Sequence, residues 1–563
     1  MGVSRPARAK LSNRGKPKRV HPAPPTADLA QASRAAIYER SPYHCRGNKG
    51  EPPKVRARPA SICPRRWTDE EATNTPSRDR TRQRVRSVGR WLPSSRLAQG
   101  RRRALRGKAY EGTSRLLPCL SHRGISSATR TVEMSALSIK VAWPPGAEFR
   151  DELDATLARV QIAIGKSNVT EHRAPRAKRE PALEIPVYYL AEWIAENWWV
   201  LLWEPNKDEE SDDSEYLRRH SIVAAEHGFP LPDLSIVPFG RAFHLTSRPR
   251  GATFANVKFM TSAVADAPRD EVETVLGEFV SKTVERLSAC GVEGTALAEA
   301  WNHLISLTAD EKEFCQLIGS LGVPPGDASD ELYEAIERIY GVFGSRATRD
   351  FCLAATRETV EASVGRLEAV NQYLHDLRPA DFARLLRTKP PQENFAAPSW
   401  RRGMQAAKIV RENLAIDAKD PRGADRLFEQ IGIDPSQHAP VPNDHVELPL
   451  AGAIDRSNDE AKVALLQPEV LHRRFSGARA AYLAWVSEAQ SRRLVTNAVT
   501  RDQQASRSFA AEILIPQSYL KSLAGSKMQL HYDQVREAAR LRRVMPDVAF
   551  KQAYNAGIRV GAI

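Results

Sequence analysis

Residues 471–485 read LHRRFSGARAAYLAW, and residues 504–516 read QASRSFAAEILIP. In both stretches the apolar residues recur every three or four positions, which is the spacing of one face of an α-helix. We therefore expect one helix in each stretch, with both helices packing into a shared core. The hydrophobic segments 446–454 and 463–466 come just before the first helix, and we expect both to be strands of a small sheet.

This helix pair resembles the core of the ImmA/IrrE family of zinc metallo-endopeptidases. The second stretch carries the more specific match, and Phe475 extends it into the first. By this resemblance, six residues carry the packing motif of the family: Phe475, Phe509, Ala510, Ala511, Glu512 and Pro516. The resemblance implies a zincin-like C-terminal domain, in which the strands before the first helix line a substrate groove.

The same resemblance places the family's zinc-site residues on positions of this chain. Arg479 stands where the first histidine ligand belongs, and Ala480 where the catalytic glutamate belongs. Leu483 takes the place of the second histidine, and Gln503 that of the third ligand, a glutamate. A zinc peptidase needs imidazole or carboxylate ligands and a glutamate that activates the metal-bound water, and arginine supplies neither. We therefore expect no catalytic residue, no zinc and no other cofactor.

An active metallo-endopeptidase with a non-standard site is the alternative hypothesis. His472 lies seven residues, about two helical turns, before Arg479 and approaches the same helix face. His438, His445 and Glu512 are further candidates, although no two of these residues have the spacing of a ligand pair. Glu512 also belongs to the packing motif, which favours a structural role for it.

The positive charge of the chain is concentrated at its start. The whole chain of 563 residues has a formal net charge of +15, and residues 1–133 contain 31 Lys and Arg against 9 Asp and Glu. The other residues contain 52 basic and 59 acidic side chains and are therefore mildly acidic. The leader at 1–133 is rich in Arg, Pro and Ser without a helical or strand period, so we expect it to be disordered.

Three interpretations of the leader stay open. In the first interpretation, translation begins at Met134, so that residues 1–133 are not part of the protein. In the second, the leader is a basic tail that binds nucleic acid through its phosphates. It is an organellar transit peptide in the third, since such peptides are rich in Arg and Ser, although the prolines argue against the amphipathic helix that they form.

The number of cysteines and the length of the apolar runs indicate the cellular compartment of the protein. The chain has six cysteines, too few and too scattered for a disulfide framework, which favours free thiols in a reducing cytoplasm. No apolar run reaches the length of a membrane span, because the most apolar stretch, 185–203, is interrupted by Glu192, Glu196 and Asn197. We therefore expect a cytoplasmic protein without a membrane partner.

Composition and periodicity divide the rest of the chain into three parts. Residues 134–180 are expected to be a short N-terminal segment and linker, in which 148–164 has the apolar spacing of a helix. Residues 181–390 are expected to form a mainly helical, Trp-rich domain with a small antiparallel sheet from 231–238, 242–247 and 253–260. Residues 391–563 are expected to form the degenerate peptidase domain. The predicted fold class is thus α+β and predominantly helical.

Within the second part, several helices are expected from residue 268 onward. One covers 272–290, another covers 295–306, and a third begins at Thr308 and Glu311, which form a capping-box signature. Two more are expected over 330–343 and 348–377. The cluster Trp193–Trp203 favours a bulky structural core, although tryptophans also stack on bases or anchor interfaces.

Three functions follow from these observations. The resemblance favours a catalytically silent regulatory protein that binds a protein partner of the repressor or toxin type, because active relatives cut DNA-binding repressors. The second is the active enzyme described above. The third is nucleic-acid binding through the leader or through the C-terminal arginines Arg536, Arg540, Arg542 and Arg543, for which two short helices around Met545 and Pro546 imitate a helix-turn-helix.

Overall fold

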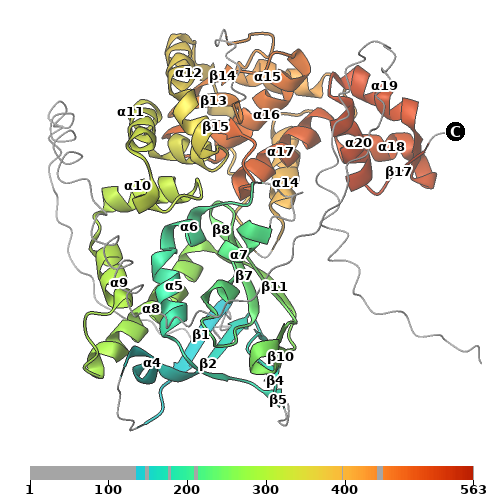
Figure 1. Cartoon of the computed structure of the whole chain (residues 1–563). Helices are drawn as coiled ribbons and strands as arrows, with labels where there is room; N and C mark the ends of the chain where they lie inside the picture. Colours follow the sequence, from blue (N-terminus) through green and yellow to red (C-terminus); the bar gives the residue numbers. More distant parts are fainter. Residues whose placement is uncertain are drawn as a thin grey trace, which may run out of the picture. The chain divides into compact units, whose positions relative to one another are not determined.

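The computed structural model describes residues 135–145, 151–174, 179–207, 214–395, 397–439 and 448–561. The leader at 1–133, for which disorder is predicted, lies outside these residues, as does His445. The described chain is a mixture of helices and strands in which helices predominate (Figure 1). No helix in the described part is long and apolar enough to cross a membrane.

The first sheet is built around β2 (Leu157–Ile164), which pairs antiparallel with β1 (Leu137–Ala142), β3 (Ser167–Asn168) and β6 (Leu183–Pro186). The helix predicted over 148–164 is therefore wrong, apart from one turn at α4 (Glu152–Ala155). Alternate residues of β2 are buried, as a strand with one face on a core requires.

A second, three-stranded antiparallel sheet has the order β11-β8-β7. The strands β7 (Asp233–Pro238) and β8 (Ala242–Arg248) confirm two of the three predicted segments. The third segment supplies β10 (Val257–Phe259) to a separate small sheet, and β11 (Ala263–Pro268) takes the place expected for it. That small sheet has the order β5-β4-β10-β9. Its other strands are β4 (His172–Arg173), β5 (Arg179–Glu180) and β9 (Gly251–Ala252).

Helices cover these sheets and lead to the C-terminal part. The Trp-rich stretch forms α5 (Tyr188–Glu196) and α6 (Trp198–Trp203), and a short α7 (Ser214–Arg219) follows. The next helices are α8 (Arg269–Ala289), α9 (Ala296–Ser306), α10 (Ala309–Gly319), α11 (Asp330–Cys352) and α12 (Arg357–Asp376). The capping box of Thr308 and Glu311 is confirmed at the start of α10. The helix predicted over 330–343 continues in α11 to Cys352 through a kink at Gly344 (φ +75°), and the helix predicted over 348–377 corresponds to the last turn of α11 and to α12.

The C-terminal part contains a four-stranded antiparallel sheet with the order β12-β14-β13-β15. Its strands are β12 (Ala380–Asp381), β13 (Leu450–Ser457), β14 (Glu460–Leu465) and β15 (Gln490–Thr496). Three helices lie between β12 and β13 in the chain, namely α13 (Ala383–Leu386), α14 (Ser399–Asn413) and α15 (Gly423–Ile431). The predicted strands thus correspond to β13 and β14, whereas β15 has no counterpart in the sequence-based prediction.

The two helices predicted from 471–485 and 504–516 are confirmed as α16 (Val470–Val486) and α17 (Arg501–Leu514). They pack against each other, with the rings of Tyr482 and Phe509 5.3 Å apart. The chain ends with α18 (Gln517–Ala524), β16 (Gln529–His531), α19 (Tyr532–Arg542), α20 (Pro546–Asn555) and β17 (Arg559–Gly561). Thus both C-terminal helices around Met545 are present.

Buried apolar side chains form three clusters. One extends from β1 to α9, so the segment before residue 180 shares a core with the Trp-rich helices. The second joins α10, α11 and α12 to one face of β13, β14 and β15. The third contains α14 to α20 and the other face of that sheet. The domain boundaries at residues 180 and 390 stay predictions. The three cores group the chain differently, because one core contains residues on both sides of 180 and another contains residues on both sides of 390.

Candidate functional site

The strand β15 and the first turn of α17 bring the predicted zinc-site positions together. Thr500 caps α17 by accepting a hydrogen bond from the backbone N–H of Gln503 (3.3 Å), which fixes Gln503 at the start of the helix. Arg479 lies in the middle of α16, which packs against α17. The side chains of Arg479 and Gln503 therefore meet between the two helices, 24 residues apart in sequence.

The Arg479 guanidinium occupies this space and is fully engaged in hydrogen bonds. Its Nη2 donates to Gln503 Oε1 (2.8 Å) and to the carbonyl of Thr496 (2.5 Å), and its Nε donates to Ser506 Oγ (3.1 Å). Gln503 Nε2 in turn donates to the carbonyl of Leu494 (2.7 Å). Arg479 is 5% exposed and Gln503 is inaccessible, so this is a buried and well-satisfied polar contact.

The donor set at these positions does not fit a zinc ion. Ala480 and Leu483 are buried hydrocarbon side chains, and a guanidinium is a cation without a lone pair to give to a metal. A divalent cation beside Arg479 would also meet electrostatic repulsion in a buried environment. Among the described residues, no group of three or more His, Cys, Asp or Glu is arranged to hold a metal ion.

The residues of the alternative site are dispersed. His472 Nδ1 lies 3.0 Å from Glu469 at the solvent-facing start of α16, and His438 is exposed near the end of the segment before β13. The Glu512 carboxylate is engaged elsewhere: it accepts from Arg411 (2.9 Å), from the backbone N–H of Gln517 (3.0 Å) and from Gln552 Nε2 (3.1 Å). Through these bonds Glu512 ties α14, α18 and α20 to α17.

The remaining motif residues lie in or beside the same core. Phe509, Ala510 and Pro516 are buried, whereas Phe475 and Ala511 are half-buried. Pro516 immediately precedes α18 and occupies its N-cap position. These placements are typical of residues with a structural role, and none of the five side chains presents a group that could take part in catalysis.

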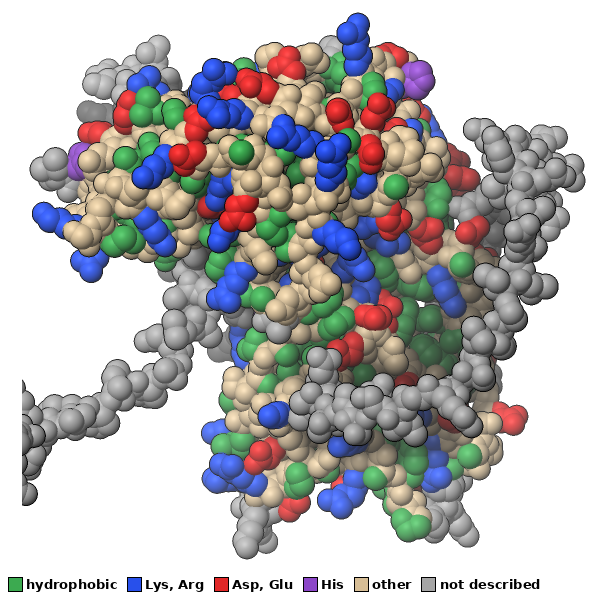
Figure 2. All heavy atoms as spheres, turned by 180° about the vertical axis from the view of Figure 1, so that it is seen from behind, with side chains coloured by type: hydrophobic (Ala, Val, Ile, Leu, Met, Phe, Trp, Pro, Cys, Tyr) green, Lys and Arg blue, Asp and Glu red, His purple; other side chains and the backbone are tan. Residues whose placement is uncertain are grey.

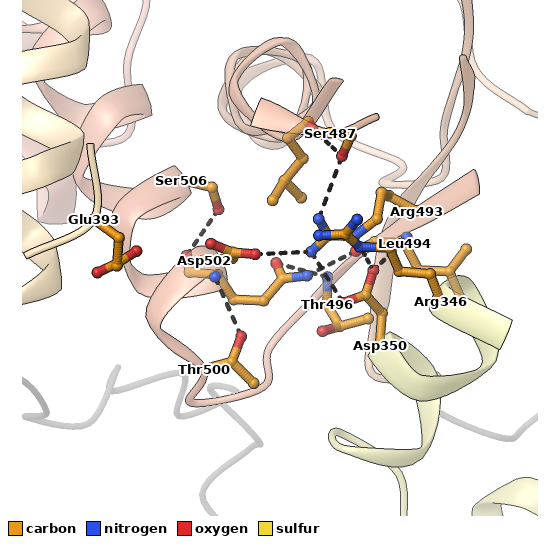
Figure 3. A network of polar contacts seen from close by, with 12 residues as sticks. Arg346, Asp350, Glu393, Ser487, Arg493, Leu494, Thr496, Thr500, Asp502 and Ser506 are labelled. Atoms are coloured by element: carbon orange, nitrogen blue, oxygen red, sulfur yellow. Dashed lines mark hydrogen bonds and ion pairs between the residues drawn. The ribbon is translucent and has the colours of Figure 1, made fainter. Parts of the chain in front are cut away.

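A second buried network lies beside the first and has no counterpart in the sequence-based prediction (Figure 3). Arg493 on β15 forms a two-pronged ion pair with Asp350 on α11, with Nε–Oδ2 at 2.6 Å and Nη2–Oδ1 at 3.2 Å. Arg493 Nη2 is also 3.5 Å from Asp502 Oδ2, and Nη1 donates to Ser487 Oγ (3.3 Å). The backbone N–H of Leu494 donates to Asp350 as well (3.2 Å).

This network favours the charged forms of Arg493 and Asp502. Burial opposes the positive charge of Arg493, but Asp350 and Asp502 outweigh it, so the pKa of this guanidinium is raised. Burial likewise opposes the charge of Asp502, but Arg493, Arg402, Arg346 and Arg241 outweigh it and lower the pKa of the carboxyl group. Four guanidinium groups therefore act on one carboxylate.

These charges line a cleft of about 1430 Å³. Its wall includes eight arginines and seven Asp or Glu residues, from the segments around α6, β8, α8, α11, β13, β15 and α17. Trp203 on α6 also lines it, and the Arg269 guanidinium stacks 3.8 Å from the centre of the Trp203 ring. In the Trp-rich cluster, Trp198 instead packs edge-on against Trp301 (5.4 Å), as a core residue does.

Of the four C-terminal arginines, Arg542 is buried, whereas Arg536, Arg540 and Arg543 are exposed. Arg542 is 1% exposed and donates to the carbonyl of Ala418 (2.5 Å), so it is not accessible to a phosphate. Arg540 pairs with Glu537 (2.6 Å) on the same helix. On the face drawn in Figure 2, basic and acidic side chains are interspersed.

Comparison of the chain with models of protein families, with curated proteins and with solved structures found no match.

Proposed function

We propose that this chain is a catalytically silent, ImmA/IrrE-like protein that binds a protein partner of the repressor or toxin type and regulates it. The observation that supports this proposal is the contact between Arg479 and Gln503. Two positions that the resemblance assigns to metal ligands do converge between two packed helices, and a guanidinium with three hydrogen bonds fills the space between them.

The chemistry of hydrolysis requires a group that activates water. In a metallopeptidase a metal ion and a glutamate perform this step, and the positions in question carry Arg479, Ala480 and Leu483. A buried arginine stays protonated and is not a general base. Such a scaffold still presents a surface with defined charge, which is sufficient for binding a partner chain without cutting it.

The decisive experiment measures metal content and peptidase activity of the purified full chain. We expect substoichiometric zinc by mass spectrometry of the metals and no cleavage of an unfolded casein substrate. One equivalent of zinc that disappears in His472→Ala or Glu512→Ala, together with zinc-dependent cleavage, would establish the active enzyme instead.

A gain-of-ligand variant tests the kinship independently. The combination Arg479→His, Ala480→Glu, Leu483→His and Gln503→Glu places three potential ligands and one base at the converging positions. We expect this variant to bind zinc when it folds, which circular dichroism checks, and the matched variant that keeps Leu483 to bind zinc much more weakly. A folded quadruple variant without zinc affinity would count against the resemblance.

A further inference from the structure

Six of the seven carboxylates in the wall of the cleft are paired with arginines of the same wall. Glu488 pairs with Arg346 (3.0 Å), and Asp455 pairs with Arg492 (3.0 Å). Glu393 pairs with Arg501 (2.8 Å). Asp350 and Asp502 share Arg493, as described above. Most of the negative charge of the cleft is therefore not available to attract a cationic ligand.

Three arginines of the cleft lack such a carboxylate. The side chain of Arg241 makes no hydrogen bond or ion pair with any residue that the structure describes, and it is exposed. Arg349 donates to Gln316 Oε1 (3.1 Å), its nearest carboxylate oxygen is 3.6 Å away on Glu313, and its buried Nε has no hydrogen-bond partner. Arg456 donates to backbone carbonyls, including that of Ala484 (2.9 Å).

The cleft consequently has uncompensated positive charge. Burial lowers the pKa of Arg269 to about 10, the neighbouring charge of Arg349 adds to this effect, and Glu273 opposes it. Burial also lowers the pKa of Arg346, with Arg493 acting in the same direction. Both shifts mean that burial disfavours the charged forms of the two guanidinium groups. An anion bound between them would stabilise these charged forms.

We propose, on the basis of the protein-binding function proposed above, that this cleft binds an extended, Asp- and Glu-rich segment of the partner protein. Carboxylates of the segment meet Arg241 and Arg349, because guanidinium groups pair with carboxylates through two parallel hydrogen bonds. Phe395, which is half-buried in the same wall, offers apolar surface to the methylene groups of the segment.

Size and charge favour a peptide over other anions. A volume of about 1430 Å³ exceeds the 300 to 1,000 Å³ that is typical of small-molecule pockets. A nucleic acid carries a phosphate on every nucleotide. In a protein segment the number and position of the carboxylates can instead match the few arginines of the wall that lack a carboxylate partner.

The test uses the full chain and a fluorescent octapeptide of alternating Asp and Glu, with the Asn and Gln octapeptide as the neutral control. Fluorescence anisotropy should show binding of the acidic peptide and a loss of affinity of about tenfold or more in Arg349→Gln and in Arg241→Gln, since hydrogen bonds to charged groups contribute about 1.5–3 kcal/mol each. Arg248→Gln is the matched control, because Arg248 is also exposed, ends the strand that Arg241 precedes, and lies outside the cleft.

The basic leader would also attract an acidic peptide, so the binding place must be located. A photo-crosslinking version of the octapeptide should label residues of the cleft wall such as Trp203 or Phe395. Crosslinks confined to 1–133, equal affinity for both octapeptides, or an equal loss in Arg248→Gln would overturn the proposal. So would tighter binding of tripolyphosphate or an oligonucleotide at the cleft, which would assign it to a phosphate ligand.

Failure of this inference and failure of the proposed function give different results. A chain without zinc and without peptidase activity that does not bind the acidic peptide contradicts the inference alone. A chain with stoichiometric zinc and zinc-dependent cleavage contradicts the proposed function, whatever the peptide does. Arg241→Gln keeps the test sound if Arg349→Gln does not fold, because Arg241 is exposed and makes no side-chain hydrogen bond among the described residues.

Discussion

The substitution Arg479→Ala removes the central group of the buried contact between α16 and α17. Three acceptors lose the Arg479 donor, namely the carbonyl of Thr496, Ser506 Oγ and Gln503 Oε1, of which the last keeps a longer hydrogen bond from the backbone N–H of Thr496 (3.4 Å). Each hydrogen bond to a charged group contributes about 1.5–3 kcal/mol to stability, and the cavity left by the side chain destabilises the protein further. Removal of a buried charge offsets part of this loss, because the charge no longer has to be desolvated. We expect a net loss of about 3 kcal/mol in the local stability of this helix pair.

Hydrogen exchange followed by mass spectrometry measures this loss where it occurs, because a chain of this size does not unfold in one step. Peptides from α16 and α17 should exchange faster, while peptides from α8 keep their rate. Arg479→Lys should be nearly as damaging, since an ammonium group cannot span the same three acceptors. Arg422→Ala is the control, because that exposed side chain forms a surface ion pair with Glu429 worth at most about 1 kcal/mol. Unchanged exchange in α16 and α17 of Arg479→Ala would refute the reasoning.

Three further predictions concern packing and buried charge. Gly403→Ala should destabilise the α14–α17 contact by more than about 2 kcal/mol, because its Cβ would lie 2.1 Å from the carbonyl oxygen of Ala505, whereas Gly365→Ala has open space and should stabilise α12 by up to about 1 kcal/mol; hydrogen exchange of peptides from these helices compares the two. Arg493→Ala should cost about 3–5 kcal/mol in the exchange of peptides from β15 and α11, because it leaves buried carboxylates without their partner. The depressed pKa of Asp502 contributes stability that is present above the pKa of an unfolded Asp and is lost as pH falls through the lower folded value. Asp502→Asn should therefore flatten the decline in thermal stability below about pH 4, and an unaltered acid limb would contradict this assignment.

Local patterns in the sequence were sufficient for the elements that rest on local interactions. The helices α16 and α17 follow from apolar spacing, and the start of α10 follows from Thr308 and Glu311, whose side chains satisfy backbone groups within one turn. The meeting of Arg479 and Gln503 was also implied, through the resemblance, as two positions of one site. The family assignment itself stays a prediction.

The wrong or missing predictions concern segments whose structure depends on contacts with residues far away in the sequence. In 157–164 the residues Leu157, Val160 and Ile164 have helical spacing, yet Leu157 is 43% exposed and the segment is a strand, because β1 and β6 supply its hydrogen bonds. The ion pair of Asp350 and Arg493 joins residues 143 positions apart, and neither residue lies in a motif that marks it. The cleft depends on such long-range contacts and was therefore not predictable.

The contact of Arg479 with Gln503 also restricts how this chain can change over generations. Replacing either residue alone leaves buried polar groups without partners, and replacing one by a histidine still gives a metal a single ligand. Every one-step change toward a zinc site thus passes through a destabilised protein that has gained no metal site. The stability of this buried contact therefore acts against the appearance of metal ligands at these two positions.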